Sequence, residues 1–163
     1  MEAVARSIDR VIDLAGRIAS WTSLVLVLLM AGNVLLRYLF RTGSVAAGEL
    51  EWHLMSPIVL IGMSYALLHD GHLRVDVVYV RFPERMKRLV DLAAALLGVA
   101  FAAIVVWLSW KYVLQSWSIG ERSPDPGGLD ARWALKAFIP FGFALLLLHA
   151  IAETIHAAGK LRR

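Results

Sequence analysis

Few residues of this chain could do chemistry, and the histidines come first among them. His69 and His72 belong to a His-Asp-Gly-His segment, and His149 lies in an apolar run much further along the chain. Two imidazoles on opposite sides of an iron can hold a haem, so His149 with His69 or His72 is one hypothesis for a cofactor site. A metal site built from His69, Asp70 and His72 is a second hypothesis.

Sequence motifs for other chemistry are absent. The chain has no nucleotide-binding P-loop, no zinc-protease motif, no nucleophile elbow and no dinucleotide fingerprint. It also has no cysteine, which excludes disulfides, zinc–thiolate sites, iron–sulfur ligation and thiol redox chemistry. The sequence therefore does not predict an enzyme.

The elements that must position these side chains are apolar. Of the 163 residues, 59% are hydrophobic and 18% are charged, and the mean hydropathy is +0.64. Soluble domains are about 45–50% apolar and about 25% charged. Residues 18–36, 52–68, 92–110 and 137–152 contain no Asp, Glu, Lys or Arg. Each run is close to the ~20 residues that cross a bilayer core as a helix.

These runs predict an all-α integral membrane protein with four transmembrane helices. We expect one membrane domain over residues 1–163, with spans at about 18–38, 50–69, 90–111 and 135–153. Before the first span, Val4, Ile8, Val11 and Ala15 recur at helical spacing, which predicts a short amphipathic N-terminal helix at the membrane surface. A solvated extension of the first helix is the alternative interpretation.

Basic residues predict the orientation. The flanks at residues 1–17, 69–91 and 153–163 carry eleven Lys and Arg, whereas the flanks at 37–51 and 111–136 carry six. Cytoplasmic flanks are enriched in Lys and Arg, so both termini are predicted to be cytoplasmic. The net charge of +4 is assigned to these membrane flanks, and nucleic acid is not an expected partner.

Polar residues within the spans are rare, and none of the central ones is a carboxylate. Ion-coupled carriers usually keep ionisable groups inside the membrane, so a stand-alone carrier is disfavoured. Asn33 is expected to bond to a neighbouring helix. The Ser-Pro-Asp-Pro-Gly-Gly segment at 123–128 predicts a compact turn. A small polytopic protein of this kind is best explained as a subunit that packs against a larger partner.

Four segments, in this order along the chain, carry a resemblance to a known family. They are Asn33-Val-Leu-Leu-Arg37-Tyr38-Leu-Phe40, Glu49-Leu-Glu51-Trp52-His53, His69-Asp-Gly-His72-Leu-Arg74-Val75-Asp76 and Gly120-Glu-Arg-Ser123-Pro124-Asp-Pro126-Gly-Gly128-Leu. Over about residues 18–155 the sequence resembles the small membrane subunit, the Q or DctQ-type component, of tripartite ATP-independent periplasmic (TRAP) transporters.

The resemblance implies a non-catalytic subunit of the bacterial inner membrane that has no cofactor of its own. It implies a large membrane subunit (M component), which carries the sodium and substrate sites, and a periplasmic binding protein (P component), which delivers an organic acid. The sodium gradient would be used by the large subunit, and this chain would be its scaffold. A haem-bearing membrane anchor of an oxidoreductase is the alternative function.

The matching segments also supply candidates for the interface with the large subunit. The candidates are Arg37, Tyr38, Glu49, Glu51, Trp52, His72, Arg74 and Asp76. Arg74 and Asp76 are expected at the cytoplasmic headgroup level, where a charge pair is less screened than on an open surface. They are therefore predicted to make the main polar contact.

Overall fold

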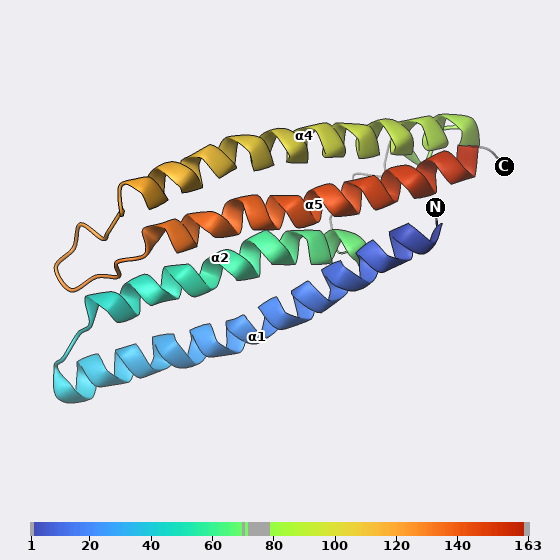
Figure 1. Ribbon diagram of the computed structural model, residues 1–163. Helices are drawn as coiled ribbons and strands as arrows, with labels where there is room; N and C mark the ends of the chain where they lie inside the picture. Colours follow the sequence, from blue (N-terminus) through green and yellow to red (C-terminus); the bar gives the residue numbers. More distant parts are fainter. Residues whose placement is uncertain (1, 70, 72–78, 162–163) are drawn as a thin grey trace.

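Long α-helices account for nearly all of the computed structural model, which describes residues 2–69, 71 and 79–161. In this part of the chain the helices are α1 (Glu2–Phe40), α2 (Val45–Leu68), α4 (Glu84–Ser118) and α5 (Arg132–Leu161) (Figure 1). Each predicted span coincides with one of these helices. The all-helical fold is therefore confirmed.

Three of these helices are long and apolar enough to cross a membrane, over Val4–Phe40, Glu84–Ser118 and Arg132–Gly159. They correspond to the first, third and fourth predicted spans. Helix α2 does not reach this level of hydropathy, because Glu49, Glu51 and His53 occupy its first turns. The second predicted span therefore stays a prediction.

The helices lie side by side in the order α4, α5, α2, α1 (Figure 1). Helix α5 packs against α4 on one side and α2 on the other, and α1 packs along α2 and also contacts α5. Both chain termini lie at one end of this layer, and the connections at 41–44 and 119–131 lie at the opposite end. For brevity, we call these the terminal end and the loop end.

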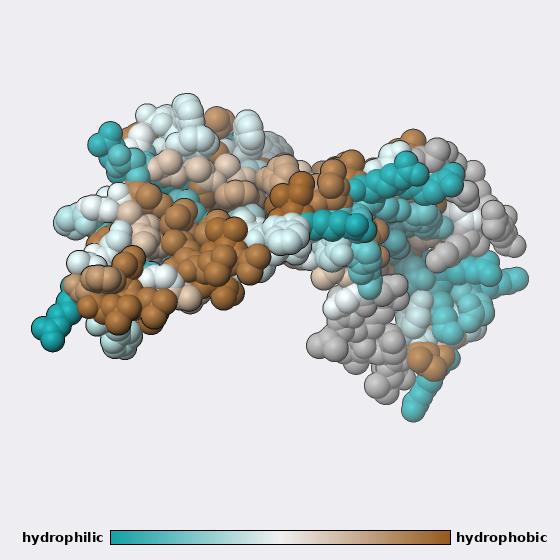
Figure 2. All heavy atoms as spheres, turned by 90° about the horizontal axis from the view of Figure 1, so that it is seen from below, coloured by the Kyte–Doolittle hydropathy of each residue, from teal (hydrophilic) through white to brown (hydrophobic). Residues whose placement is uncertain are grey.

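Much of the layer's surface is apolar. Large hydrophobic side chains are exposed on every helix, from Leu28 in α1 to Leu97 in α4. Figure 2 shows this apolar surface over the left and middle parts of one face, with hydrophilic residues gathered toward the right. This distribution is expected where lipid or another membrane protein covers the middle of a helix layer.

The N-terminal residues do not form a separate short helix, because residues 2–40 belong to one uninterrupted α1. The buried face of this segment also differs from the predicted one. Ile8 and Ala15 pack against the core as expected, but Val4 and Val11 are exposed, and Ile12 is fully buried instead. The buried face differs from the predicted one because the N-terminal half of α1 packs against the other helices of the layer.

One buried core cluster joins three helices. Ile12 and Ala19 of α1, Ile61 of α2 and Leu145 of α5 form one buried cluster. Near it, a side chain on Gly16 would overlap the ring of Tyr65, so glycine is what lets α1 approach α2 here. Small residues serve the same purpose in many membrane helix pairs.

The helix ends follow the local sequence signals. Ser44 caps α2 by accepting a hydrogen bond from the Ala47 N–H at 3.2 Å. Helix α2 ends at Leu68, and just beyond it the Gly71 N–H donates to the Ala66 carbonyl at 2.7 Å. Pro83 immediately precedes α4, a place where the missing N–H of proline costs the helix no hydrogen bond.

Candidate functional site

The first turns of α2 carry two glutamates that bind to different neighbours. Glu51 accepts a hydrogen bond from the Asn33 side-chain amide of α1, with 3.2 Å between Nδ2 and Oε1. Asn33 is only 9% exposed. The expected bond from Asn33 to a neighbouring helix is therefore confirmed, and its acceptor is one of the candidate interface residues.

Glu49 binds the connection between α4 and α5. Its Oε2 accepts a hydrogen bond from the Leu129 N–H at 2.6 Å, and its Oε1 accepts one from the Ser123 hydroxyl. The Arg132 guanidinium lies 3.7 Å from Oε1. The Glu49 side chain is 15% exposed, so these donors replace much of the water that an ionised carboxylate would otherwise bind.

The connection itself is the compact turn that the sequence predicted. The Ser123 N–H donates to the Leu129 carbonyl at 3.1 Å, and the Gly128 N–H donates to the Asp125 carbonyl at 3.0 Å. The two glycines have different roles. Gly127 has a φ of +80°, whereas a Cβ on Gly128 would stand 2.6 Å from Ser123 Cβ and 2.8 Å from Glu49 Oε2. Gly128 is needed for the close approach of the turn to Glu49.

A second charged pair holds the start of the same connection. The Lys136 ammonium of α5 donates to Glu121 Oε2 and lies 4.0 Å from the centroid of the Tyr112 ring in α4. Nearby, the Trp117 and Trp133 rings pack edge to face, with 4.4 Å between the ring centroids. These contacts join the last turns of α4 to the first turns of α5 at the loop end.

Two carboxyl groups at the loop end, those of Glu49 and Glu121, are stabilised in their ionised form. Hydrogen bonds from Ser123 and the Leu129 N–H, with the Arg132 charge, lower the pKa of Glu49 below its ordinary value. Hydrogen bonding from the Lys136 ammonium, together with its charge, lowers the pKa of Glu121. A carboxylate saturated with donors is a poor general base, so Glu49 is best understood as an electrostatic tie.

The other candidate interface residues at the loop end point outward. Tyr38 is 82% exposed and Trp52 is 73% exposed, and Arg37 is also exposed. They differ in this from Glu49 and Glu51, which have partners within the chain. The role of all five in an interface stays a prediction.

The remaining candidates, His72, Arg74 and Asp76, lie outside the described residues, as does Asp70 of the hypothetical metal site. The neighbouring His69 is described, and its Nε2 lies 3.1 Å from Asp13 Oδ1 of α1. Arg17 Nε lies 2.9 Å from the other oxygen of Asp13.

The haem and metal hypotheses gain no support from this geometry. His69 contacts Asp13, and its ring lies tilted against that of Tyr65 with 4.4 Å between the ring centroids, whereas His149 is buried in α5. Within residues 2–69, 71 and 79–161, no group of three or more His, Asp or Glu side chains could hold a metal ion.

Sequence reasoning missed the partners of Glu49. Ser123 and Leu129 are 74 and 80 residues away from it along the chain, and no local pattern indicates such a pairing. The available signals were the Ser-Pro-Asp-Pro-Gly-Gly turn and the glutamates at the start of an apolar helix. Asp13 was likewise missed as the partner of His69.

These features define a class of protein. It is a polytopic helical membrane protein whose charged contacts gather at the two ends of the layer, and whose apolar surface is open to lipid or to another subunit. Residues 26–159 match the model of one family, described as the DctQ component of tripartite ATP-independent periplasmic transporters.

The chain belongs to this DctQ family. It is a multi-pass protein of the bacterial inner membrane, as the family match and the long apolar helices indicate. This confirms the resemblance seen in the sequence. The family gives no support to a haem-bearing anchor.

Two curated relatives share the name "C4-dicarboxylate TRAP transporter small permease protein DctQ". The Vibrio cholerae protein is 30% identical over 139 residues, which cover 73% of this chain and 60% of the relative. The Pseudomonas aeruginosa protein is 28% identical over 110 residues, which cover 63% of this chain and 52% of the relative. The chain thus spans little more than half the length of these relatives.

Proposed function

We propose that this chain is the non-catalytic scaffold of a sodium-coupled TRAP transporter that imports small organic acids. The DctQ family match carries the proposal. The large subunit would hold the sodium and substrate sites, and a periplasmic binding protein would deliver the substrate. The names of the two relatives favour C4-dicarboxylates within the predicted class of organic acids.

The proposal includes four membrane crossings with both termini in the cytoplasm. Helix α2 runs beside α1 and α5 from the loop end toward the terminal end (Figure 1). Its 24 residues are long enough to cross a bilayer core, which supports a crossing by α2 as well. The excess of Lys and Arg in the flanks at the terminal end supports the orientation. The loop end would then face the periplasm.

The exposed face of α2 is the best candidate for the surface that binds the large subunit. Trp52, Met55 and Val59 are exposed at helical spacing along it. Beside them, a hollow of about 240 Å³ lies between α2 and α5, with Leu60 and Leu135 in its lining. A hollow on an apolar helix face can receive a side chain from a partner helix, which is how membrane helices gain packing energy.

A wedge substitution tests this surface. Val59→Trp should reduce co-purification of the chain with a tagged large subunit several-fold, because the indole would occupy the hollow and hold the partner helix away. Leu97→Trp is the matched control, because Leu97 is an exposed apolar residue on α4. Both variants should reach the membrane at the level of the unmodified chain.

The outcomes are distinguishable. If Leu97→Trp releases the large subunit and Val59→Trp does not, the interface lies on α4 and the α2 surface is wrong. If the unmodified chain never co-purifies with the large subunit, the scaffold proposal is wrong. Separately, Arg74→Ala and Asp76→Asn should weaken co-purification without reducing insertion, because four other basic residues remain in segment 69–91.

A further inference from the structure

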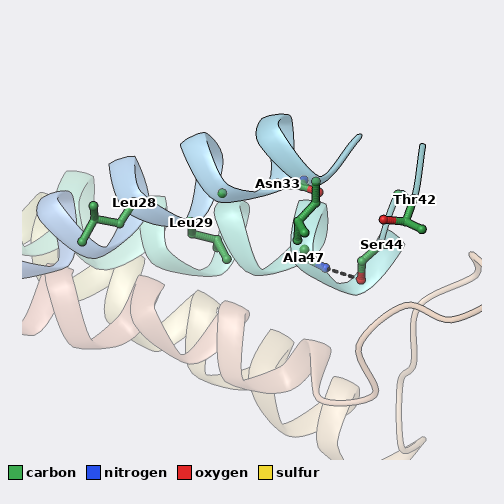
Figure 3. Close-up of a pocket in the computed structure, with 9 residues that line it drawn as sticks. Leu28, Leu29, Asn33, Thr42, Ser44 and Ala47 are labelled. Carbon is green, nitrogen blue, oxygen red and sulfur yellow. Dashed lines mark hydrogen bonds between the residues drawn. The ribbon is translucent and has the colours of Figure 1, made fainter. Parts of the chain in front are cut away.

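A second hollow, at the loop end, lies outside the proposed α2 surface. It occupies about 310 Å³ between the last turns of α1, the connection at 41–44 and the first turn of α2. Its apolar lining includes Leu28, Leu29 and Leu36 of α1 and Ala47 of α2, and Figure 3 shows Ala47 beside Asn33. We call this hollow the α1–α2 groove.

The groove changes from apolar to polar along its length. Leu28 and Leu29 line the part nearer the middle of the layer, Asn33 follows, and Thr42 and Ser44 line the part at the loop end (Figure 3). From Leu28 to Leu36 a helix rises about 12 Å. A lipid whose acyl chains point toward the bilayer centre changes from apolar to polar in the same direction.

Two arginines adjoin residues that line the groove near its polar end. Arg37 adjoins Leu36 in the last turn of α1, and Arg41 immediately precedes Thr42. Both are exposed, and within the described part of the chain neither guanidinium has an ion-pair partner. Guanidinium groups bind phosphate oxygens well, because their N–H groups form a planar fork.

We propose that the α1–α2 groove binds an anionic phospholipid, with one acyl chain on its leucine floor and the headgroup phosphate at Arg37 and Arg41. The apolar-to-polar direction of the groove matches a lipid standing in the leaflet at the loop end. The positive charge at its polar end matches the phosphate. This inference requires only that the chain sits in a membrane, and it does not depend on the identity of the transported substrate.

Gly32 offers a direct way to fill the groove. It lines the groove, and a Cβ placed on it would have no other atom within 4 Å. Gly32→Leu should therefore fold normally while its side chain occupies the path of the acyl chain. Gly62→Leu is the matched control, because Gly62 also has nothing within 4 Å of a Cβ and does not line the groove.

The test is native mass spectrometry of the full chain with dioleoyl phosphatidylglycerol or dioleoyl phosphatidylcholine added. The unmodified chain should retain phosphatidylglycerol in preference to phosphatidylcholine. Arg37→Ala and Arg41→Ala should each weaken phosphatidylglycerol binding roughly fivefold. Gly32→Leu should weaken the binding of both lipids, and Gly62→Leu should change neither. Circular dichroism confirms that each variant keeps its helices.

Three results would overturn the proposal: equal retention of the two lipids by the unmodified chain, unchanged lipid retention by Gly32→Leu, or equal loss in Gly62→Leu. A fourth result would show that the groove binds the large subunit and not a lipid. If Gly32→Leu releases the large subunit from the purified complex and leaves lipid retention unchanged, the groove is a protein contact. In cells, a photoreactive amino acid at Leu36 should crosslink to phospholipid, whereas crosslinking only to protein would contradict the proposal.

Discussion

Gly142 of α5 lies directly against the backbone of Leu60 in α2. A Cβ on Gly142 would stand 2.6 Å from Leu60 Cβ and 2.8 Å from the Leu60 carbonyl oxygen. Because the second of these atoms belongs to the backbone, a side-chain rotation cannot relieve the overlap. The two central helices of the layer therefore approach as closely as they do because residue 142 has no side chain.

Gly142→Ala should separate α2 from α5 and destabilise the protein by about 1–3 kcal/mol, the usual cost of overpacking. The measurement is the unfolding free energy in detergent micelles. Gly62→Ala provides the control, because a methyl group there meets no neighbour, and it should change stability little. Equal stability of the two variants would show that the helices adjust at no cost.

Glu49→Gln should loosen the connection at 119–131. Glutamine offers one neutral oxygen and an amide that cannot accept, so either the Leu129 N–H or the Ser123 hydroxyl would lose its acceptor. Trypsin cleavage after Arg122, which is exposed within this turn, should then become several-fold faster. Glu84→Gln at the exposed start of α4 should leave the rate unchanged. Unaltered cleavage in Glu49→Gln would mean that the turn holds its shape without the carboxylate.

The pH dependence of stability follows from the lowered pKa values of Glu49 and Glu121. In the folded chain both groups have a pKa below the ordinary value of 4.5, so they bind protons more weakly than in the unfolded chain. Their contribution to stability is therefore present above about pH 4.5 and is lost as the pH falls through the lower, folded-state pKa values.

The unfolding free energy, measured from pH 7 down to pH 3, should thus decline below pH 4.5. In the double variant Glu49→Gln with Glu121→Gln the decline should be shallower. A decline of the same slope in the double variant would show that other groups cause it.

Topology can be tested on a chain that has no cysteine to remove. Gly43→Cys and Asp125→Cys place thiols at the loop end, and Arg85→Cys places one near the start of α4 at the terminal end. In intact cells with a permeable outer membrane, an impermeant thiol reagent should label positions 43 and 125 and leave position 85 unlabelled. Labelling of 85 with protection of 125 would reverse the proposed orientation.

The sequence alone was sufficient to predict the helices but not their packing. Charge-free runs of nearly twenty residues indicate helices whatever surrounds them. They carry little periodicity when lipid covers much of the helix surface, so the contact of Gly142 with Leu60 had no sequence signal. The N-terminal half of α1 shows the same limit, because apolar spacing favoured a face with Val11 whereas the packed face contains Ile12.

The candidate site was predicted in part. Glu49 and Glu51 were singled out because they belong to a segment that resembles the family, and their contacts within the chain are with Ser123, Leu129 and Asn33. Those contacts join segments that are distant along the chain, and only the folded structure brings them together. Asn33 was the exception, because a lone amide inside an apolar run nearly always needs a partner.

Transport by reconstituted vesicles tests the central claim most directly, namely that this chain supports a transporter without moving solute itself. Vesicles containing only this chain, given a sodium gradient and labelled C4-dicarboxylates or 2-oxoacids, should show no uptake above empty vesicles. Vesicles that also contain the large subunit, supplied with loaded binding protein, should take up substrate, and omission of this chain should abolish that uptake. Sodium-driven uptake by the lone chain, or full uptake when it is omitted, would contradict the account.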